Sequence, residues 1–252
     1  MKNIPHNARL YVVAIVSTFS SFTVSAQQQQ KQVTNLSQTW IGFNSLFRLN
    51  NKWGISADGS YRSNQFFSSD YYGISRVGIN YWVNDDILLT AGFGHQWTAP
   101  KIKGWHTIAN ENRLYQQVLV SSKVGRVSIS NRLRNEERWQ EKIVADTNTH
   151  VSVFTDRVRY QLMLVVPFTR KPYFPSLVVS DELMLQMGKS IVYNTFDQNR
   201  SFIGLRETFT GNLSFDIGYM LVDQQKSTGY QYERDHIFRV FFLYNPDCRK
   251  KK

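Results

Sequence analysis

Apolar and polar residues alternate with a period of two along most of the chain. Residues 213–221 show the pattern clearly, with one face made of Leu213, Phe215, Ile217, Tyr219 and Leu221 and the other of Ser214, Asp216, Gly218 and Met220. Successive side chains of a strand point to opposite faces, whereas a helix would not sort the residues in this way. The pattern therefore predicts β-strands.

Eleven segments of about ten residues follow this pattern, at residues 38–49, 53–63, 71–82, 87–98, 112–123, 126–140, 153–166, 176–187, 200–209, 212–223 and 235–244. Tight connections such as Asn50-Asn51-Lys52 alternate with longer ones such as residues 99–111 and 141–152. Outer-membrane barrels place short turns in the periplasm and long loops outside. We therefore predict an all-β fold, an antiparallel up-and-down transmembrane β-barrel.

We expect the number of strands to be even. Single-chain bacterial barrels usually have an even number of strands, and a first strand running toward the periplasm would leave the N-terminus outside. We therefore expect about twelve strands, with an additional first one near Gln32 to Ser37 or within a long loop. Ten strands is the alternative.

The first 26 residues have the parts of a secretory signal peptide. Lys2 and Arg9 precede an apolar stretch at 10–19, and Val24-Ser25-Ala26 is a small-residue ending. The apolar stretch is too short to cross a bilayer of roughly 30 Å as a helix. We predict residues 1–26 as a cleaved signal peptide and 27–252 as a single outer-membrane β-barrel domain of a Gram-negative bacterium.

Composition agrees with a membrane barrel, since aromatic residues make up 14% of the chain, charged residues 19%, and the mean hydropathy is −0.38. Alternating lipid-facing and lumen-facing residues produce such a balance. A soluble β-sandwich or lipocalin-like barrel has the same alternation with its apolar face inward, and the sequence leaves this alternative open. The single cysteine, Cys248, excludes an internal disulfide.

The net charge suggests which partners to expect. It is +11 for the whole chain and +9 once Lys2 and Arg9 leave with the signal peptide. For an exported chain this surplus indicates outer-membrane lipid and lipopolysaccharide, or an anionic solute. The sequence contains no motif for binding nucleic acid, and we expect none to be bound.

Aromatic residues collect near the ends of the predicted strands, as in the belts at the two membrane interfaces. The girdle candidates are Trp40, Trp53, Tyr81, Trp82, Trp97, Trp139, Phe168 and Tyr244. The last alternating segment ends at Tyr244 and is similar to the signal that the barrel-insertion machinery recognises. We expect that machinery as a partner, although a tail of residues 245–252 follows the signal.

Charges within strand-like segments are the most unusual feature. Predicted lumen-lining residues are Arg132, Arg134, Glu136, Arg138, Arg157, Arg159, Glu182, Arg206 and Asp216. A charge facing lipid at mid-depth would cost roughly 2–4 kcal/mol, whereas a polar lumen tolerates it. Two interpretations stay open. The charges could form a salt-bridged filling, or they could form an arginine-rich constriction that attracts anions.

Catalysis and metal binding have little support in the sequence. An outer-membrane lipid-modifying enzyme would need a nucleophile beside a base, and His95, His106 and His150 occur in no recognisable constellation. The pair Asp85-Asp86 offers too few oxygen ligands for calcium and suits a turn. We expect no catalytic residue, no metal and no cofactor, with a lipid hydrolase or acyltransferase as the alternative.

Several stretches together resemble the outer-membrane barrel family called domain of unknown function 2490, which is common among bacteroidetes. They are residues 38–42, 53–55, 132–139, 157–160, 181–182 and 198–200. The resemblance covers nearly all of the mature chain and implies a barrel fold and an outer-membrane location, without an activity. We therefore expect a small porin-like, anion-preferring channel or a ligand-binding barrel, with a closed structural or envelope-interaction barrel as the alternative.

Overall fold

The computed structural model describes residues 30–100, 102–171 and 174–249, and the predicted signal peptide lies outside this range. Residues Lys31–Lys252 form one compact unit. Its strands are β1 (Gln32–Arg48), β2 (Trp53–Asn64), β3 (Ser69–Trp82), β4 (Ile87–Thr98), β5 (Ala109–Val124), β6 (Val127–Val144), β7 (Thr147–Pro167), β8 (Ser176–Met187), β9 (Phe196–Thr208), β10 (Leu213–Gln225) and β11 (Gln231–Tyr244).

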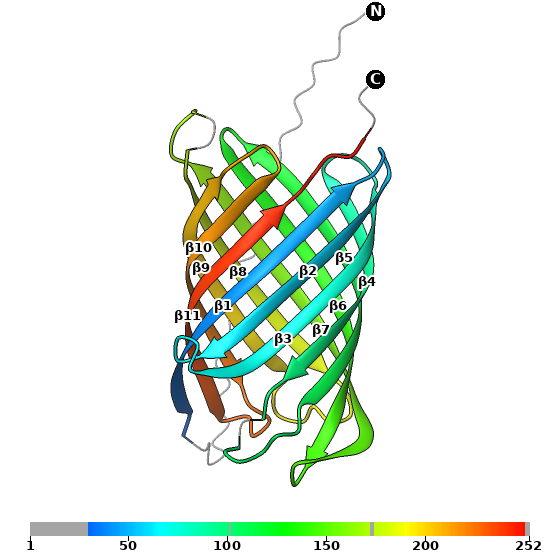
Figure 1. Cartoon of the computed structure of the whole chain (residues 1–252), viewed down its shortest axis with the longest axis vertical. Helices are drawn as coiled ribbons and strands as arrows, with labels where there is room; N and C mark the ends of the chain where they lie inside the picture. Colours follow the sequence, from blue (N-terminus) through cyan, green and yellow to red (C-terminus); the bar gives the residue numbers. More distant parts are fainter. Residues whose placement is uncertain (1–29, 101, 172–173, 250–252) are drawn as a thin grey trace, which may run out of the picture. The chain divides into compact units, whose positions relative to one another are not determined.

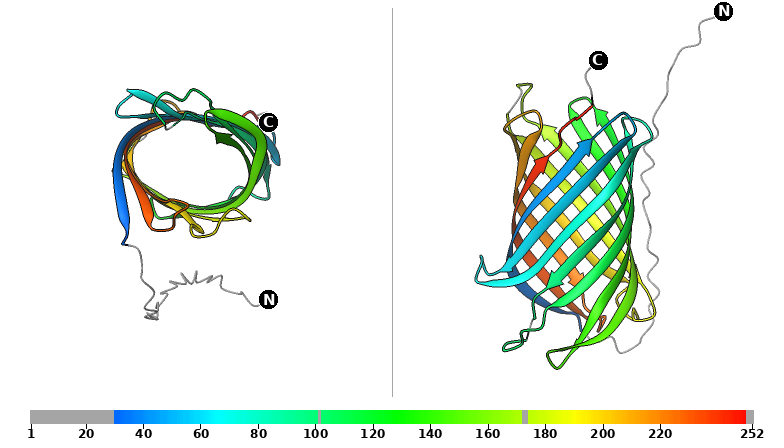
Figure 2. Two further views of the ribbon diagram at one scale, coloured as in Figure 1. Left: turned by 90° about the horizontal axis from the view of Figure 1, so that it is seen from below. Right: turned by 45° about the vertical axis from the view of Figure 1, so that its right-hand side comes forward.

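The eleven strands form a closed barrel in chain order (Figure 1). Each strand pairs antiparallel with the next, and β1 closes the ring by pairing parallel with β11, from Gln32↔Gln231 to Ser45↔Tyr244. Figure 2 shows the closed ring in its left view. No helix in the part of the chain that the structure describes is long and apolar enough to cross a membrane.

The strand number corrects our prediction of twelve, and the alternative of ten is wrong as well. With eleven alternating strands the first and the last run in the same direction, and a parallel ladder of evenly spaced, slanted hydrogen bonds joins them. The region from Gln32 to Ser37 is the beginning of β1 and not a separate strand.

The barrel has two different ends. At the turn end, where odd-numbered strands finish, Asn50 Oδ1 accepts hydrogen bonds from the Lys52 and Trp53 amides at 2.9 and 2.8 Å, an Asx turn of the kind that favours asparagine. At the other, loop end, the predicted loop 141–152 is largely strand. There β6 and β7 meet at Ala145 and Asp146, whose φ angles of 48° and 57° suit a type I′ hairpin turn.

The side chains are sorted so that the outer wall is apolar and the interior polar. Among the described residues, 43 large hydrophobic side chains are exposed and only eleven are buried. Ile79, on the outer wall of β3, is 61% exposed, whereas Glu136 is fully buried in the interior. This arrangement is the inverse of a lipocalin-like barrel with an apolar core.

Most of the predicted girdle lies on the outer wall, where Trp53 packs against Tyr81 with ring centroids 4.9 Å apart and Trp139 against Phe154 at 5.4 Å. Trp97, Phe168 and Tyr244 are also exposed there. Trp40 and Trp82 differ from the prediction, because both are buried in the interior. Their positions in the strand alternation give them the inward parity, and this outweighs the preference of tryptophan for an interface.

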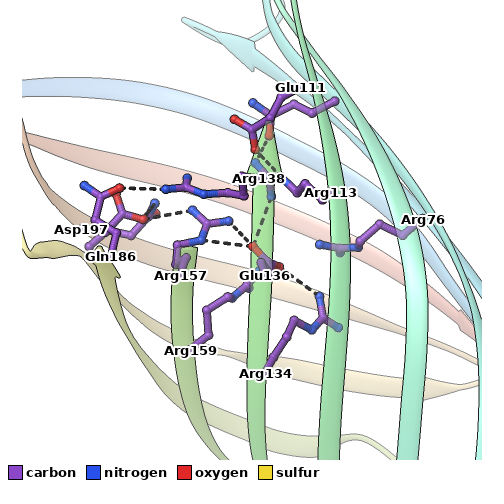
Figure 3. Close-up of polar contacts among 12 residues, drawn as sticks. Arg76, Glu111, Arg113, Arg134, Glu136, Arg138, Arg157, Arg159, Gln186 and Asp197 are labelled. Atoms are coloured by element: carbon purple, nitrogen blue, oxygen red, sulfur yellow. Dashed lines mark hydrogen bonds and ion pairs between the residues drawn. The ribbon is translucent and has the colours of Figure 1, made fainter. Parts of the chain in front are cut away.

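The interior has an apolar side and a charged side. The apolar cluster of Trp40, Val178, Phe202, Met220, Val222 and Ile237 lies on β1 and β8 to β11. The densest charges project from β5, β6 and β7 (Figure 3), and the strand order places β6 on the opposite side of the barrel from β1. The charged wall of the lumen is therefore the candidate functional site.

Candidate functional site: the arginine-rich lumen

The structure places all nine predicted lumen residues on the inner face. Arg132, Arg134, Glu136 and Arg138 come from β6, Arg157 and Arg159 from β7, and Glu182, Arg206 and Asp216 from β8, β9 and β10. Their strand neighbours Leu133, Tyr160 and Leu183 are exposed on the outer wall. Period-two alternation thus turns these nine side chains inward, whereas Glu137, between Glu136 and Arg138, points outward.

Glu136 is the hub of the charged wall (Figure 3). Its Oε1 lies 2.6 Å from Arg159 Nη1 and 3.5 Å from Arg134 Nη1. Its Oε2 accepts a hydrogen bond from Arg157 Nε at 3.1 Å and lies 3.4 Å from Arg113 Nη1. A carboxylate offers about four lone-pair sites, so four arginines occupy it fully. We call Glu136 with Arg113, Arg134, Arg157 and Arg159 the septum.

Further ion pairs tie the septum to the rest of the wall. Arg157 Nη1 lies 3.0 Å from Asp197 Oδ2, and Arg113 Nε lies 2.5 Å from Glu111 Oε1. Arg159 also contacts Glu182 at 2.7 Å. The contacts of Arg157 with Asp197 and of Arg159 with Glu182 join different strands and fix the septum in the lumen, whereas Glu111 and Arg113 lie on the same strand.

A second set of pairs lies beyond the septum. Arg132 Nη2 lies 2.6 Å from Glu182 Oε1, and Arg206 forms a two-pronged pair with Asp216 at 2.7 and 2.9 Å. Arg132 is thus joined to the septum through Glu182, and the pair of Arg206 with Asp216 extends the charges of the lumen to β10.

Several lumen residues were not predicted from the sequence, namely Asp58, Arg62, Arg76, Glu111, Arg113, Asp197, Arg200 and Arg239. All of them lie on strands other than β6 and β7, whose dense charge runs carried most of the prediction. Their positions in the strand alternation would have identified them, because Arg76 is next to the outward Val77 and Arg239 is next to the outward Phe238.

Two cavities occupy the lumen. The loop-end chamber has a volume of about 370 Å³ and is lined partly by the exposed connection residues Ser190 and Ser227. The turn-end chamber measures about 200 Å³. They share the lining residues Trp40, Arg62, Tyr72, Arg113, Arg157 and Arg200. Because Arg113 and Arg157 both bind Glu136, the septum lies at the boundary between the chambers.

The chambers are electropositive. Ten arginines and three carboxylates line the turn-end chamber, and six basic and three acidic side chains line the loop-end chamber. A concave surface with one sign of charge in excess concentrates solutes of the opposite sign. The lumen therefore carries an excess of positive charge, which favours anions over cations.

The histidines lie apart from this network. His95 Nδ1 is 2.7 Å from Asn112 Oδ1, and His236 Nδ1 is 2.6 Å from the Tyr219 hydroxyl on the outer wall. His106 and His150 lie at the loop end, in the β4–β5 connection and at the start of β7. Among the described residues, no group of three histidine, cysteine or acidic side chains could hold a metal ion.

Fold and lumen together define a class: closed, mainly antiparallel β-barrels with an apolar outer wall and an arginine-rich interior. Within it, the chain belongs to the family described as Protein of unknown function (DUF2490), whose model matches residues 37–233, and the family predicted from the sequence is thereby confirmed. Searches of the curated proteins and of the solved structures give no significant match.

Proposed function

We propose that the chain is an outer-membrane β-barrel of a Gram-negative bacterium whose septum closes the lumen to free diffusion, leaving an anion-binding chamber at the loop end. The observation that carries this proposal is the four-arginine coordination of the buried Glu136 at the boundary between the two chambers. The pattern of a signal peptide at residues 1–26 supports export.

The outer wall supports insertion into a membrane. Soluble monomers rarely expose apolar patches larger than a few hundred Å². Here exposed apolar side chains recur on strand after strand around the barrel, for example Val77, Ile79, Leu133, Leu162 and Ile203. The strands are 12 to 21 residues long, and a tilted transmembrane strand needs about 9–11. In this proposal the turn end faces the periplasm and the loop end faces outside.

The septum favours a closed barrel over an open channel. A passing ion would have to separate Glu136 from its arginines, and the contacts with Arg157 and Arg159 are charge-assisted hydrogen bonds between neighbouring strands. The chambers on the two sides are small, polar and differently lined. These features suit a barrel that binds a solute from one side.

Cysteine labelling tests the membrane location. Leu162→Cys, in a Cys248→Ser background, puts a thiol on the outer wall, and Gly125→Cys puts one in the exposed β5–β6 turn as a control. In outer-membrane fragments, whose two faces are both open to water, we expect a lipid-phase reagent to label residue 162 and a water-soluble maleimide to label residue 125. Water-soluble labelling of both positions would contradict membrane insertion.

Liposome swelling tests closure of the lumen. Liposomes containing the refolded wild-type protein should swell no faster in isotonic arabinose than protein-free liposomes, because the septum blocks the path. Insertion is verified in the same sample by protection of the barrel from protease. Rapid swelling of liposomes with inserted protein would contradict the closed lumen.

A further inference from the structure

We propose that the loop-end chamber contains a binding site for a phosphate or sulfate group, built by Arg62, Arg138 and Arg200. This inference deepens the proposed function by naming the class of anion, and it needs the chamber to face solvent. The three residues come from β2, β6 and β9, and all line the same chamber. They differ from the septum arginines in what they bind.

Arg62 is held by aromatic rings and not by acceptors. Its guanidinium carbon lies 3.6 Å from the centroid of the Trp40 ring and 4.1 Å from that of Tyr72. Among the described residues no group accepts a hydrogen bond from Arg62, and its buried Nε has no partner. Cation–π contacts fix a guanidinium group through its flat face and leave the N–H donors at its edge available to an acceptor. Those donors line the chamber.

Arg138 is buried with its charge unmatched. The residue is 9% exposed, and its Nη2 donates a hydrogen bond to Gln186 Oε1 at 2.8 Å. Its Nε has no partner, and no carboxylate of the described residues lies within ion-pair distance. A buried charge that is not paired is costly, and an entering anion would offset that cost.

Arg200 shares an aromatic support with Arg62. Its guanidinium carbon lies 5.2 Å from the Trp40 centroid, its Nε donates to Gln198 at 2.9 Å, and its nearest carboxylate contact is Glu182 at 3.8 Å. Two guanidinium groups against one indole ring repel each other unless an anion lies near both. Trp40 therefore fixes two positive groups at a spacing that one anion can bridge.

The septum arginines are neutralised by carboxylates, which places the anion site at the other arginines of the chamber. Arg113 and Arg157 are neutralised by Glu111, Glu136 and Asp197. The acidic residues that line the loop-end chamber are Glu111, Asp197 and Asp235, and the first two are engaged with those septum arginines. The sixth basic residue, Lys226, is paired with Glu233 at 2.6 Å. The positive excess of the chamber thus comes mainly from Arg62, Arg138 and Arg200.

The geometry selects an oxyanion. Guanidinium groups bind phosphate and similar anions through two parallel hydrogen bonds, a pattern that chloride cannot accept. The buried amide Nε2 of Gln38, which also lines the chamber, has no partner and adds a neutral donor. A volume of about 370 Å³ accommodates a free oxyanion or a small solute that carries one.

Isothermal titration of the purified full-length barrel in detergent micelles, at constant chloride, tests the site with inorganic phosphate and with glycerol 1-phosphate. Binding of both probes would indicate a site for the group itself, and binding of the ester alone would indicate a site for a phosphorylated solute. Either result supports the proposal. Absence of binding of both probes would overturn it.

Substitutions locate the binding. Arg62→Gln and Arg138→Gln should each weaken binding by at least about tenfold, since each removes a charge-assisted contact. Arg62→Lys keeps the positive charge but cannot donate two parallel hydrogen bonds, so it should give an intermediate loss of affinity. Arg126→Gln is the matched control, because it removes an exposed charge at the β5–β6 turn. Equal affinity in all folded variants would contradict this site.

The outcomes separate this inference from the proposed function. Heat-modifiable mobility on gels shows whether each variant folds as a barrel. A barrel that inserts, excludes arabinose and binds no oxyanion would leave the closed barrel intact and remove the site. A barrel that passes arabinose yet binds phosphate through Arg62 and Arg138 would remove the closed lumen and leave the site.

Discussion

Glu136 Oε1 lies 2.6 Å from Arg159 Nη1, although Glu136 is registered opposite Arg157 and not opposite Arg159. The residue opposite Arg159 is Arg134, so β6 and β7 bring two like charges face to face at that position. Like charges directly opposite destabilise a sheet. Glu136 contacts Arg159 diagonally across the strand pair and Arg134 along its own strand, and these contacts offset that repulsion. This carboxylate is therefore central to the pairing of the two strands.

Replacing the hub should destabilise the barrel. Glu136→Gln keeps the shape of the side chain and removes the charge that four arginines share, and breaking a buried pair in this way typically costs about 3–5 kcal/mol. Urea unfolding of the protein refolded into lipid vesicles, followed by tryptophan fluorescence, measures the change. Glu137→Gln, on the outer wall of the same strand, is the control and should change stability little. Equal stability of the two variants would contradict the hub role.

The parallel seam predicts a specific cross-link. Ile41 and Val240 are registered partners on the outer faces of β1 and β11. Ile41→Cys with Val240→Cys, in a Cys248→Ser background, should form a disulfide under mild oxidation. Ile41→Cys with Ile217→Cys should not, because Ile217 on β10 is two strands from Ile41, roughly 10 Å away, and a disulfide needs Cα atoms within about 7 Å. A further strand between β1 and β11 would abolish the first cross-link.

Asp146, in the hairpin turn between β6 and β7, binds the β4–β5 connection, and we call this contact the latch. Its carboxylate accepts hydrogen bonds from the Thr107 amide at 2.7 Å and the His106 amide at 2.9 Å. The hydrogen bond from the Thr107 backbone is the main cause that lowers the pKa of Asp146. A lowered pKa means that the latch contributes fully above the ordinary carboxyl pKa and is lost as pH falls through the lowered value.

Nuclear magnetic resonance of the Thr107 amide can follow this latch. We expect its shift to change with a midpoint below about 3.9, the ordinary value for aspartate. Asp146→Asn should remove the pH dependence and leave the rest of the barrel unchanged. A midpoint at or above the ordinary value in the wild-type protein would mean that the two amides do not hold the carboxylate.

The strands and the two faces of each could be predicted from alternation, because the period of two sorts Arg134 from Leu133 and Arg159 from Tyr160 whatever the tertiary fold. Which face points inward was shown by the structure. The strand number could not be predicted in this way. Closure depends on whether β1 and β11 can pair directly, and their parallel ladder connects residues about 200 positions apart, which no local pattern reveals.

The site was predicted only in part. Dense charge runs on β6 and β7 stood out in the sequence, whereas Arg62 and Arg200 are single charges whose role depends on a shared contact with Trp40. Trp40 itself was assigned to the girdle on its residue type, although its parity with the buried Gln38 places it inside. Contacts across the lumen are three-dimensional, so the sequence names their members singly and not as a set.

Single-channel recording in planar bilayers tests the central claim, a lumen closed by the septum, most directly. Wild-type protein, with insertion verified by protease protection, should give no steady current steps. Glu136→Ala with Arg157→Ala, which removes the centre of the septum without changing the net charge, should give small anion-preferring steps because arginines still line both chambers. Steady steps from the wild-type barrel, equal to those of the double variant, would contradict the account.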